Sequence, residues 1–86
     1  MIYSIYALRD QAAQAFLAPV LNTTDNAAIR DLANMVSQHD NSNIAFAPKD
    51  FDLYQIGTYD TDSGLVVAAS PIRMVCNAGS LVKNDG

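Results

Sequence analysis

A turn between two strand-like runs, within residues 51–70, constrains the fold of this chain more than any other feature. The first run, "FDLYQIGTYD", alternates in a way that is typical of a β-strand, and the second, "LVVAAS", is short and apolar. Between them, "DTDSG" offers turn-forming Asp and Ser and a Gly that accepts a left-handed conformation. This spacing predicts a β-hairpin and therefore a sheet. Strict alternation puts one set of side chains on a single face: Phe51, Leu53, Gln55, Gly57 and Tyr59.

The two carboxylates of this turn, Asp60 and Asp62, also allow two chemical interpretations. A calcium loop needs Gly at its sixth position and Glu at its twelfth, but Leu65 and Pro71 occupy those positions, and the chain contains no Glu. Paired acid–base catalysis needs surroundings that separate two pKa values, which an exposed turn does not offer. We therefore expect a simple turn, with no metal ion and no catalytic role.

The N-terminal part of the chain predicts two more strands. Residues 2–8, "IYSIYAL", are aromatic and β-branched, and neither face of such a strand would be fully polar. We therefore expect a helix to cover one face and a partner to cover the other. A second strand is predicted at about 15–21, and it contains Pro19. Because Pro cannot donate to a ladder, this strand should lie at an edge, or Pro19 should mark a bulge.

The segment "TTDNAAIRDLANMVSQ" is the clearest helix. Thr24 is the predicted N-cap, and Asp25 and Asn26 fall in the first turn, where free backbone N–H groups favour negative and polar side chains. An apolar stripe follows the helical period, and we expect it to pack on the sheet. Its members are Ala28, Ile29, Leu32, Ala33, Met35 and Val36.

The remaining segments complete an α+β prediction. Residues 39–50 are polar and turn-prone and predict a loop, and Pro71 is expected to end the strand "LVVAAS". Residues 72–82 predict either a further strand or a turn of helix. The predicted fold is a small, mostly antiparallel sheet with one amphipathic helix packed on it, in the order β-β-α-β-β plus a short C-terminal element. It forms one domain of residues 1–82, followed by a polar tail at 83–86.

Composition limits what this domain can do. Half of its 86 residues are hydrophobic, so it should fold, but a core of this size often gains from self-association, and we expect a homodimer. All nine acidic residues are Asp, and the net charge of −4 disfavours broad phosphate binding, which needs a basic face. The cations are dispersed along the sequence, although folding could gather them: Arg9, Arg30, Lys49, Arg73 and Lys83.

No constellation of catalytic or metal-binding residues is evident. Glycine-rich phosphate loops, HExxH and paired-Cys motifs are missing, and one histidine, His39, cannot form a histidine cluster. Cys76 is alone and reads as a buried structural thiol. We therefore expect neither catalysis nor a cofactor. The chain shows no signal sequence and no apolar run of about 20 residues, so we expect a soluble protein that does not enter membranes.

Several segments nevertheless have a familiar order: "IYALRD", "FLAPVL", "DNAAIRDLANMV", "PKDFDLYQIGTYDTDSG" and "PIRMVCNAGSLV". Together they resemble the small nonstructural protein of gokushovirus-type microviruses, which are single-stranded DNA phages of bacteria. The resemblance covers roughly residues 2–82, and "AIR" and "DFDLYQIGTYD" are its most specific parts. It implies a protein of viral DNA replication or packaging, often labelled DNA-binding, in the cytoplasm of the infected host. It implies no catalytic residues.

Two hypotheses follow. In the first, the protein contacts single-stranded DNA through a local patch, for which Arg9, Arg30 and Arg73 are the candidates, with Tyr6 stacking on a base. The other tyrosines, Tyr3, Tyr54 and Tyr59, are also able to stack, but packing in the core or on the sheet is the simpler role for each. In the second, the protein is a dimeric interaction module that binds a phage or host replication or assembly factor without touching DNA.

Overall fold

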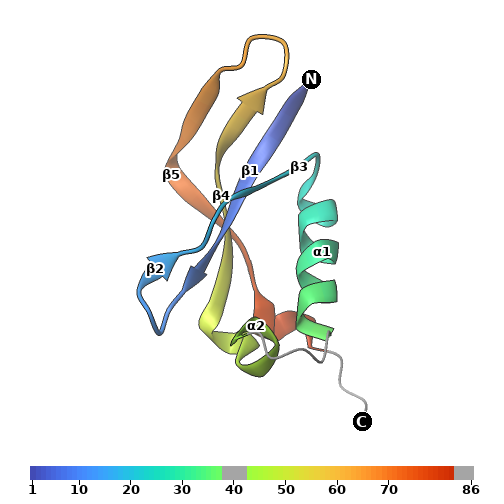
Figure 1. The fold of residues 1–86 in the computed structure, drawn as a ribbon, viewed down its shortest axis with the longest axis vertical. Coiled ribbons are helices and arrows are strands. Elements are labelled where there is room, and N and C mark those ends of the chain that lie inside the picture. Colours follow the sequence, from blue (N-terminus) through green and yellow to red (C-terminus); the bar gives the residue numbers. More distant parts are fainter. Residues whose placement is uncertain (38–42, 83–86) are drawn as a thin grey trace.

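The computed structural model describes residues 1–37 and 43–82. Its architecture is α+β, with a mostly antiparallel sheet and one main helix, which confirms the predicted fold class and element order (Figure 1). The strands are β1 (Ile2–Asp10), β2 (Ala15–Phe16), β3 (Val20–Asn22), β4 (Phe51–Asp60) and β5 (Val66–Asn77). The helices are α1 (Asp25–Ser37), α2 (Asn43–Phe46) and the 3-10 turns η1 (Pro48–Asp50) and η2 (Ala78–Leu81).

The sheet has the order β2-β1-β4-β5, and β3 also pairs with β1. Because β4 occupies one side of β1, the short strands β2 and β3 share the other side: β2 pairs with the C-terminal end of β1, and β3 pairs with its middle. Phe16 pairs with Arg9, and Leu21 pairs with Ile5. Pro19 lies in the gap between the two short strands. The predicted edge strand is thus confirmed, and it is interrupted at its proline.

The pairing of β4 with β1 contains a bulge. Ile5 pairs with Gly57 but Tyr6 pairs with Gln55, so Ile56 is an extra residue in β4. The predicted strict alternation is therefore wrong beyond Gln55. Leu53 and Gln55 lie on the same face of the sheet as Tyr6, whereas Gly57 and Tyr59 lie on the opposite face, which is that of Ile5.

Strand β5 continues through Pro71, where the sequence predicted its end. The prediction fails because β5 is the outermost strand and residues 69–72 lie in an irregularity without partners in β4, so the missing N–H of Pro71 removes no bond of the ladder. Residues 72–82 accordingly form both predicted alternatives in succession, a strand as far as Asn77 and then the turn η2.

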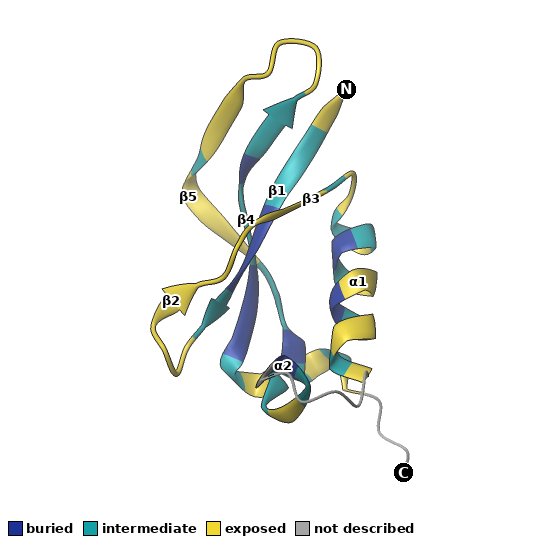
Figure 2. Ribbon diagram, in the orientation of Figure 1, coloured by how far each residue is buried: buried dark blue, intermediate teal, exposed yellow. Residues whose placement is uncertain are grey.

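Helix α1 begins as predicted, because the Ala27 N–H donates to the Oγ1 of Thr24 at 3.1 Å. Ala28 and Leu32 are its buried residues, and they belong to a core under the lower half of the sheet. Figure 2 shows the buried segments gathered there, between α1 and the adjoining parts of β1 and β4. The core consists of Tyr6, Leu8, Ala28, Leu32, Ile44, Phe51, Leu53 and Ala78.

The segment predicted as a loop at 39–50 forms two short helical turns, α2 and η1, on either side of Ala47. Ile44 of α2 is buried in the core and stabilises this helical turn. The polar residues around it gave no sign of the turn in the sequence. Pro48 opens η1, a position that suits its fixed φ. The beginning of the predicted loop, residues 38–42, and the predicted tail, 83–86, lie outside the described residues.

The hairpin of β4 and β5 extends well beyond α1 (Figure 1). The left-to-right order of β1, β4 and β5 reverses between the top and the bottom of this view, so the sheet twists strongly. As a result, the side of the molecule seen in Figure 1 shows one face of the sheet in its upper half and the other face in its lower half. None of the helices in residues 1–37 and 43–82 is long and apolar enough to span a bilayer.

Candidate functional site

The predicted DNA-contacting cations do not gather on one surface. Arg9 lies near the end of β1, Arg30 on the exposed side of α1, and Arg73 in β5. Arg73 pairs with Gln55 on the face that α1 covers, whereas alternation along β1 places Arg9 on the opposite face. The exposed Lys49 belongs to η1, at the end of the molecule where α2 and η2 also lie. DNA contact by these residues stays a prediction, but the described residues form no basic patch that would support it.

Tyr6 is buried in the core of the domain. Its side chain has no exposed area and forms part of the core, so a base cannot stack on its ring in this structure. Its hydroxyl donates to the Oδ1 of Asp25 at 2.6 Å. Tyr6 therefore connects the sheet to the first turn of α1, and the stacking role predicted for it does not fit its placement.

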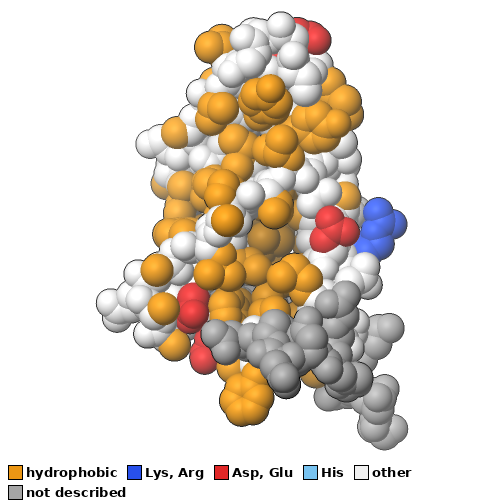
Figure 3. Space-filling model, viewed as in Figure 1, with side chains coloured by type: hydrophobic (Ala, Val, Ile, Leu, Met, Phe, Trp, Pro, Cys, Tyr) orange, Lys and Arg blue, Asp and Glu red, His pale blue; other side chains and the backbone are white. Residues whose placement is uncertain are grey.

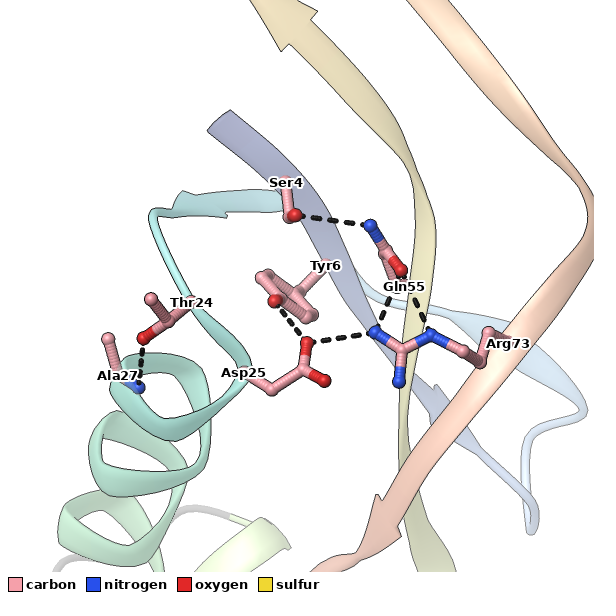
Figure 4. A network of polar contacts seen from close by, with 7 residues as sticks. All are labelled: Ser4, Tyr6, Thr24, Asp25, Ala27, Gln55 and Arg73. Atoms are coloured by element: carbon pink, nitrogen blue, oxygen red, sulfur yellow. Dashed lines mark hydrogen bonds and ion pairs between the residues drawn. The ribbon is translucent and has the colours of Figure 1, made fainter. Parts of the chain in front are cut away.

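A polar cluster joins α1 to three strands (Figure 4). The Nη2 of Arg73 donates to the Oδ1 of Asp25 at 2.8 Å and to the Oε1 of Gln55 at 2.8 Å. The Nε of Arg73 also donates to the Oε1 of Gln55, at 3.0 Å. The Nε2 of Gln55 in turn donates to the Oγ of Ser4 at 3.1 Å. Arg73 is thus held in place by internal partners, which leaves less of it for an external phosphate.

The electrostatics of this cluster favour its charged form. The hydrogen bond from Arg73, followed by that from Tyr6, lowers the pKa of Asp25 below its ordinary value. Burial, and then the bond to Asp25, raises the pKa of Tyr6. A carboxylate whose pKa is lower in the folded state contributes stability above its unfolded pKa and loses it as pH falls through the folded value.

We therefore expect the Asp25→Asn variant to be less stable than the wild type near neutral pH, and the difference to shrink in acid. The unfolded pKa of Asp is about 3.9, so the convergence should begin below it. Urea unfolding followed by circular dichroism, at about pH 6 and at about pH 2.5, measures the difference directly. Equal differences at both pH values would show that Asp25 is not held as a carboxylate by Arg73. Asp31→Asn, on the same helix but with an exposed side chain that has no contact with Arg73, is the matched control.

A second polar group, centred on Asp52, ties the lower end of the sheet to the turns. Asp52 is only 8% exposed and accepts hydrogen bonds from the Nε2 of Gln11 at 2.6 Å and the Nδ2 of Asn77 at 2.8 Å. The Oδ1 of Asn77 accepts the Gly79 N–H and caps η2. Nearby, burial and then the charge of Asp52 raise the pKa of the Cys76 thiol, which suits a structural rather than a reactive cysteine.

The sequence "DTDSG" forms the predicted hairpin turn. The Oδ1 of Asp60 accepts the Asp62 N–H at 2.9 Å, the Asp60 carbonyl accepts the Gly64 N–H at 2.8 Å, and Gly64 has a left-handed φ of 74°. The Asp60 carboxylate is therefore used by the turn itself. Within residues 1–37 and 43–82, no group of three His, Cys or Asp side chains lies close enough to hold a metal ion.

The most conspicuous surface is the sheet face opposite α1, which we call the open face. Its centre is a shallow apolar groove with a volume of about 490 Å³. Beside the groove, the rings of Phe16 and Tyr54 meet edge to face, with centroids 5.7 Å apart. Figure 3 shows hydrophobic side chains spread over the upper half and the centre of the visible side, with basic atoms only at its margin. The groove is lined by Ile5, Pro19, Leu21, Ile56, Tyr59 and Val66.

This surface has the composition of a protein-binding site. Leu21 and Phe16 are almost half exposed, and Val66 is 64% exposed, although a small soluble domain would ordinarily bury or avoid such residues. Interface cores are enriched in aromatic residues and Met and depleted of charge. Sequence reasoning predicted a partner on one face of β1 but not the extent of the surface, because the bulge at Ile56 is what brings Tyr59 onto it.

The fold and this surface define a small α+β domain with one covered and one open sheet face. The chain belongs to the phage ORF5 protein family, whose model matches residues 3–81. It is therefore a phage protein, which agrees with the phage origin that the sequence resemblance implied. No significant match was found among curated proteins or among solved structures.

Proposed function

We propose that this phage protein is a non-enzymatic interaction module that binds a phage or host protein through its open face. The observation that carries the proposal is the apolar groove of that face, whose lining contains no charged residue. In line with the resemblance to the small nonstructural protein of gokushoviruses, we place its action in replication or packaging of a single-stranded DNA genome, in the host cytoplasm.

Charge supports a protein partner over a nucleic acid. The chain carries a net charge of −4, and the described cations lie on separate elements and on both sides of the sheet. Neutralising phosphates requires several cations on one surface, whereas an apolar groove with aromatic rings in and beside it gains affinity by desolvation. The open face therefore suits an apolar segment of another protein better than a phosphate backbone.

The test is affinity capture from infected host cells with the wild type and two variants. Leu21→Lys puts a charge into the groove at a residue that is 46% exposed, and Val82→Lys makes the same change at a residue that is 47% exposed and lies away from the groove. We expect the wild type and Val82→Lys to recover the same phage or host protein and Leu21→Lys to lose at least tenfold of it. Recovery of nothing but the protein itself by the wild type, or equal recovery by Leu21→Lys, would refute the proposal.

A second function, contact with single-stranded DNA, is favoured by one observation. Alternation and register place Tyr3, Tyr54 and Tyr59 on the open face with Arg9, and aromatic rings on an open sheet can stack on bases. Fluorescence anisotropy with single-stranded oligonucleotides at two salt concentrations tests this function. If DNA is contacted, Arg9→Gln should weaken binding and reduce its salt dependence, while Arg30→Gln on α1 should not. No binding at low salt would show that direct DNA contact is wrong.

A further inference from the structure

The outer edge of β5 has no partner among the described elements. β5 has 12 residues and is the last strand in the sheet order, with β4 as its neighbour on the inner side. Natural edge strands are usually kept short or protected by charges, Pro or a covering element, because their free N–H and C=O groups can pair with another chain. Between Val66 and Ala69, this edge has none of these protections.

The hairpin turn determines which backbone groups of this edge point outward. The Asp60 N–H donates to the Leu65 carbonyl at 3.0 Å, so the polar backbone groups of Asp60 face β5. Since these directions alternate along a strand, Thr58 and its partner Val67 form a hydrogen-bonded pair between β4 and β5. Val66 and Ala68 therefore turn their N–H and C=O groups away from β4, toward the free side.

The distribution of charge makes a second copy of this chain a suitable partner for the edge. Two copies, each with a net charge of −4, repel each other, but none of the nine Asp residues lies in β5. The single charged residue of the strand, Arg73, is engaged with Asp25 and Gln55. Contact along β5 therefore brings together a stretch of the chain without carboxylates, which limits the repulsion between the two copies.

Comparison of the two sheet edges favours a closed dimer. The opposite edge consists of β2 with two residues and β3 with three, separated by Pro19. This edge is broken at residues 17–19, where Pro19 has no N–H to donate, so a head-to-tail contact that would propagate into a filament is disfavoured. Pairing β5 with β5 uses the same surface on both copies and closes after two.

We propose that two copies of this protein pair through the Val66–Ala68 edge of β5, antiparallel and about a two-fold axis. Val66 of each copy exchanges both backbone hydrogen bonds with Ala68 of the other, because these residues carry the outward groups. Val67 then lies opposite Val67 of the second copy in a pair without backbone hydrogen bonds. The two sheets become continuous, and the open faces of both copies stay accessible, so this dimer does not depend on the proposed function.

The first experiment measures the mass of the protein in solution by sedimentation equilibrium. The wild type is expected at twice its 9.3 kDa at high concentration. Val67→Lys should be monomeric at the same concentration, because its ammonium group would face a second one across the axis. Val20→Lys, 56% exposed on the opposite edge against 60% for Val67, should remain dimeric. A wild type that stays monomeric, or a Val67→Lys variant that stays dimeric, would overturn the proposal.

A second experiment tests the register and does not depend on the tolerance of Val67 for lysine. Residues in a pair without backbone hydrogen bonds have Cα atoms about 4.5 Å apart, within the range that a disulfide spans. Val67→Cys should therefore form a covalent dimer when equilibrated with glutathione disulfide, whereas the wild type, with only Cys76, and Val20→Cys should stay monomeric on a non-reducing gel. A dimeric protein in which Val67→Cys fails to cross-link would place the contact elsewhere. Wild-type assemblies larger than two would contradict the closed edge.

Discussion

Replacing Gly57 by Ala is expected to lower the free energy of unfolding by roughly 3 kcal/mol, the upper end of the usual cost of overpacking. Gly57 is buried in β4, opposite Ala68, and an added Cβ would lie 2.5 Å from the carbonyl oxygen of Val67. This obstacle is backbone, which cannot rotate away as a side chain would. Relief would require β5 to move outward and weaken its pairing with β4. Because a domain of this size has a total stability of about 4–13 kcal/mol, the loss is a large share of it.

Gly64→Ala is the matched control for this prediction. Gly64 has a φ of 74° but no atom within 4 Å of an added Cβ, so the substitution introduces backbone strain without a collision. Its expected cost is about 1 kcal/mol. Urea unfolding of the two variants beside the wild type measures both values. If Gly57→Ala is no less stable than Gly64→Ala, the close approach of β5 to the bulge would be wrong.

The Leu53→Ala variant should lose about 3 kcal/mol of unfolding free energy, while Leu21→Ala should lose about 0.5 kcal/mol. Both changes remove the same atoms from the same sheet. Leu53 is 4% exposed and packs in the core against α1, so its removal leaves a cavity, whereas Leu21 is 46% exposed on the open face. Thermal or urea unfolding of the purified variants provides the comparison.

This pair also separates stability from binding. If the open face exists for a partner, Leu21→Ala should keep the fold and weaken the capture of that partner, because the methyl groups that it removes line the groove. A large loss of stability in Leu21→Ala would show instead that the groove is filled by parts of this chain. In that case, the groove would not be open to a partner.

Local signals in the sequence predicted the elements well. The apolar period and Thr24 define α1, and Asp60 and Gly64 define the turn, because the groups that stabilise each lie within a few residues of one another. The extra residue at Ile56 has no such local signal. An alternating strand looks the same whether its partner follows it regularly or skips one residue, so the side on which Tyr59 lies depends on the pairing with β1.

The polar cluster was beyond sequence reasoning for a related reason. Arg73 and Asp25 are 48 residues apart, and nothing near Arg73 distinguishes a cation that binds a helix from one that faces solvent. The alternation of β1 identifies two faces but does not tell which one the helix covers, so the sequence alone does not distinguish a buried Tyr6 from one that stacks on a base. The partner on the opposite face, by contrast, was predicted from that same alternation and stays a proposal.

The interrupted edge of β2 and β3 has one more consequence, for how the protein tolerates changes in length. Leu17, Ala18 and Val20 line a hollow of about 140 Å³ against α1, whereas Pro19 and Leu21 line the groove of the open face. This segment therefore separates two apolar depressions. Insertion or deletion of a single residue here would exchange the side chains offered to the two depressions. Relatives of this protein should therefore vary in residue type along this segment more readily than in its length.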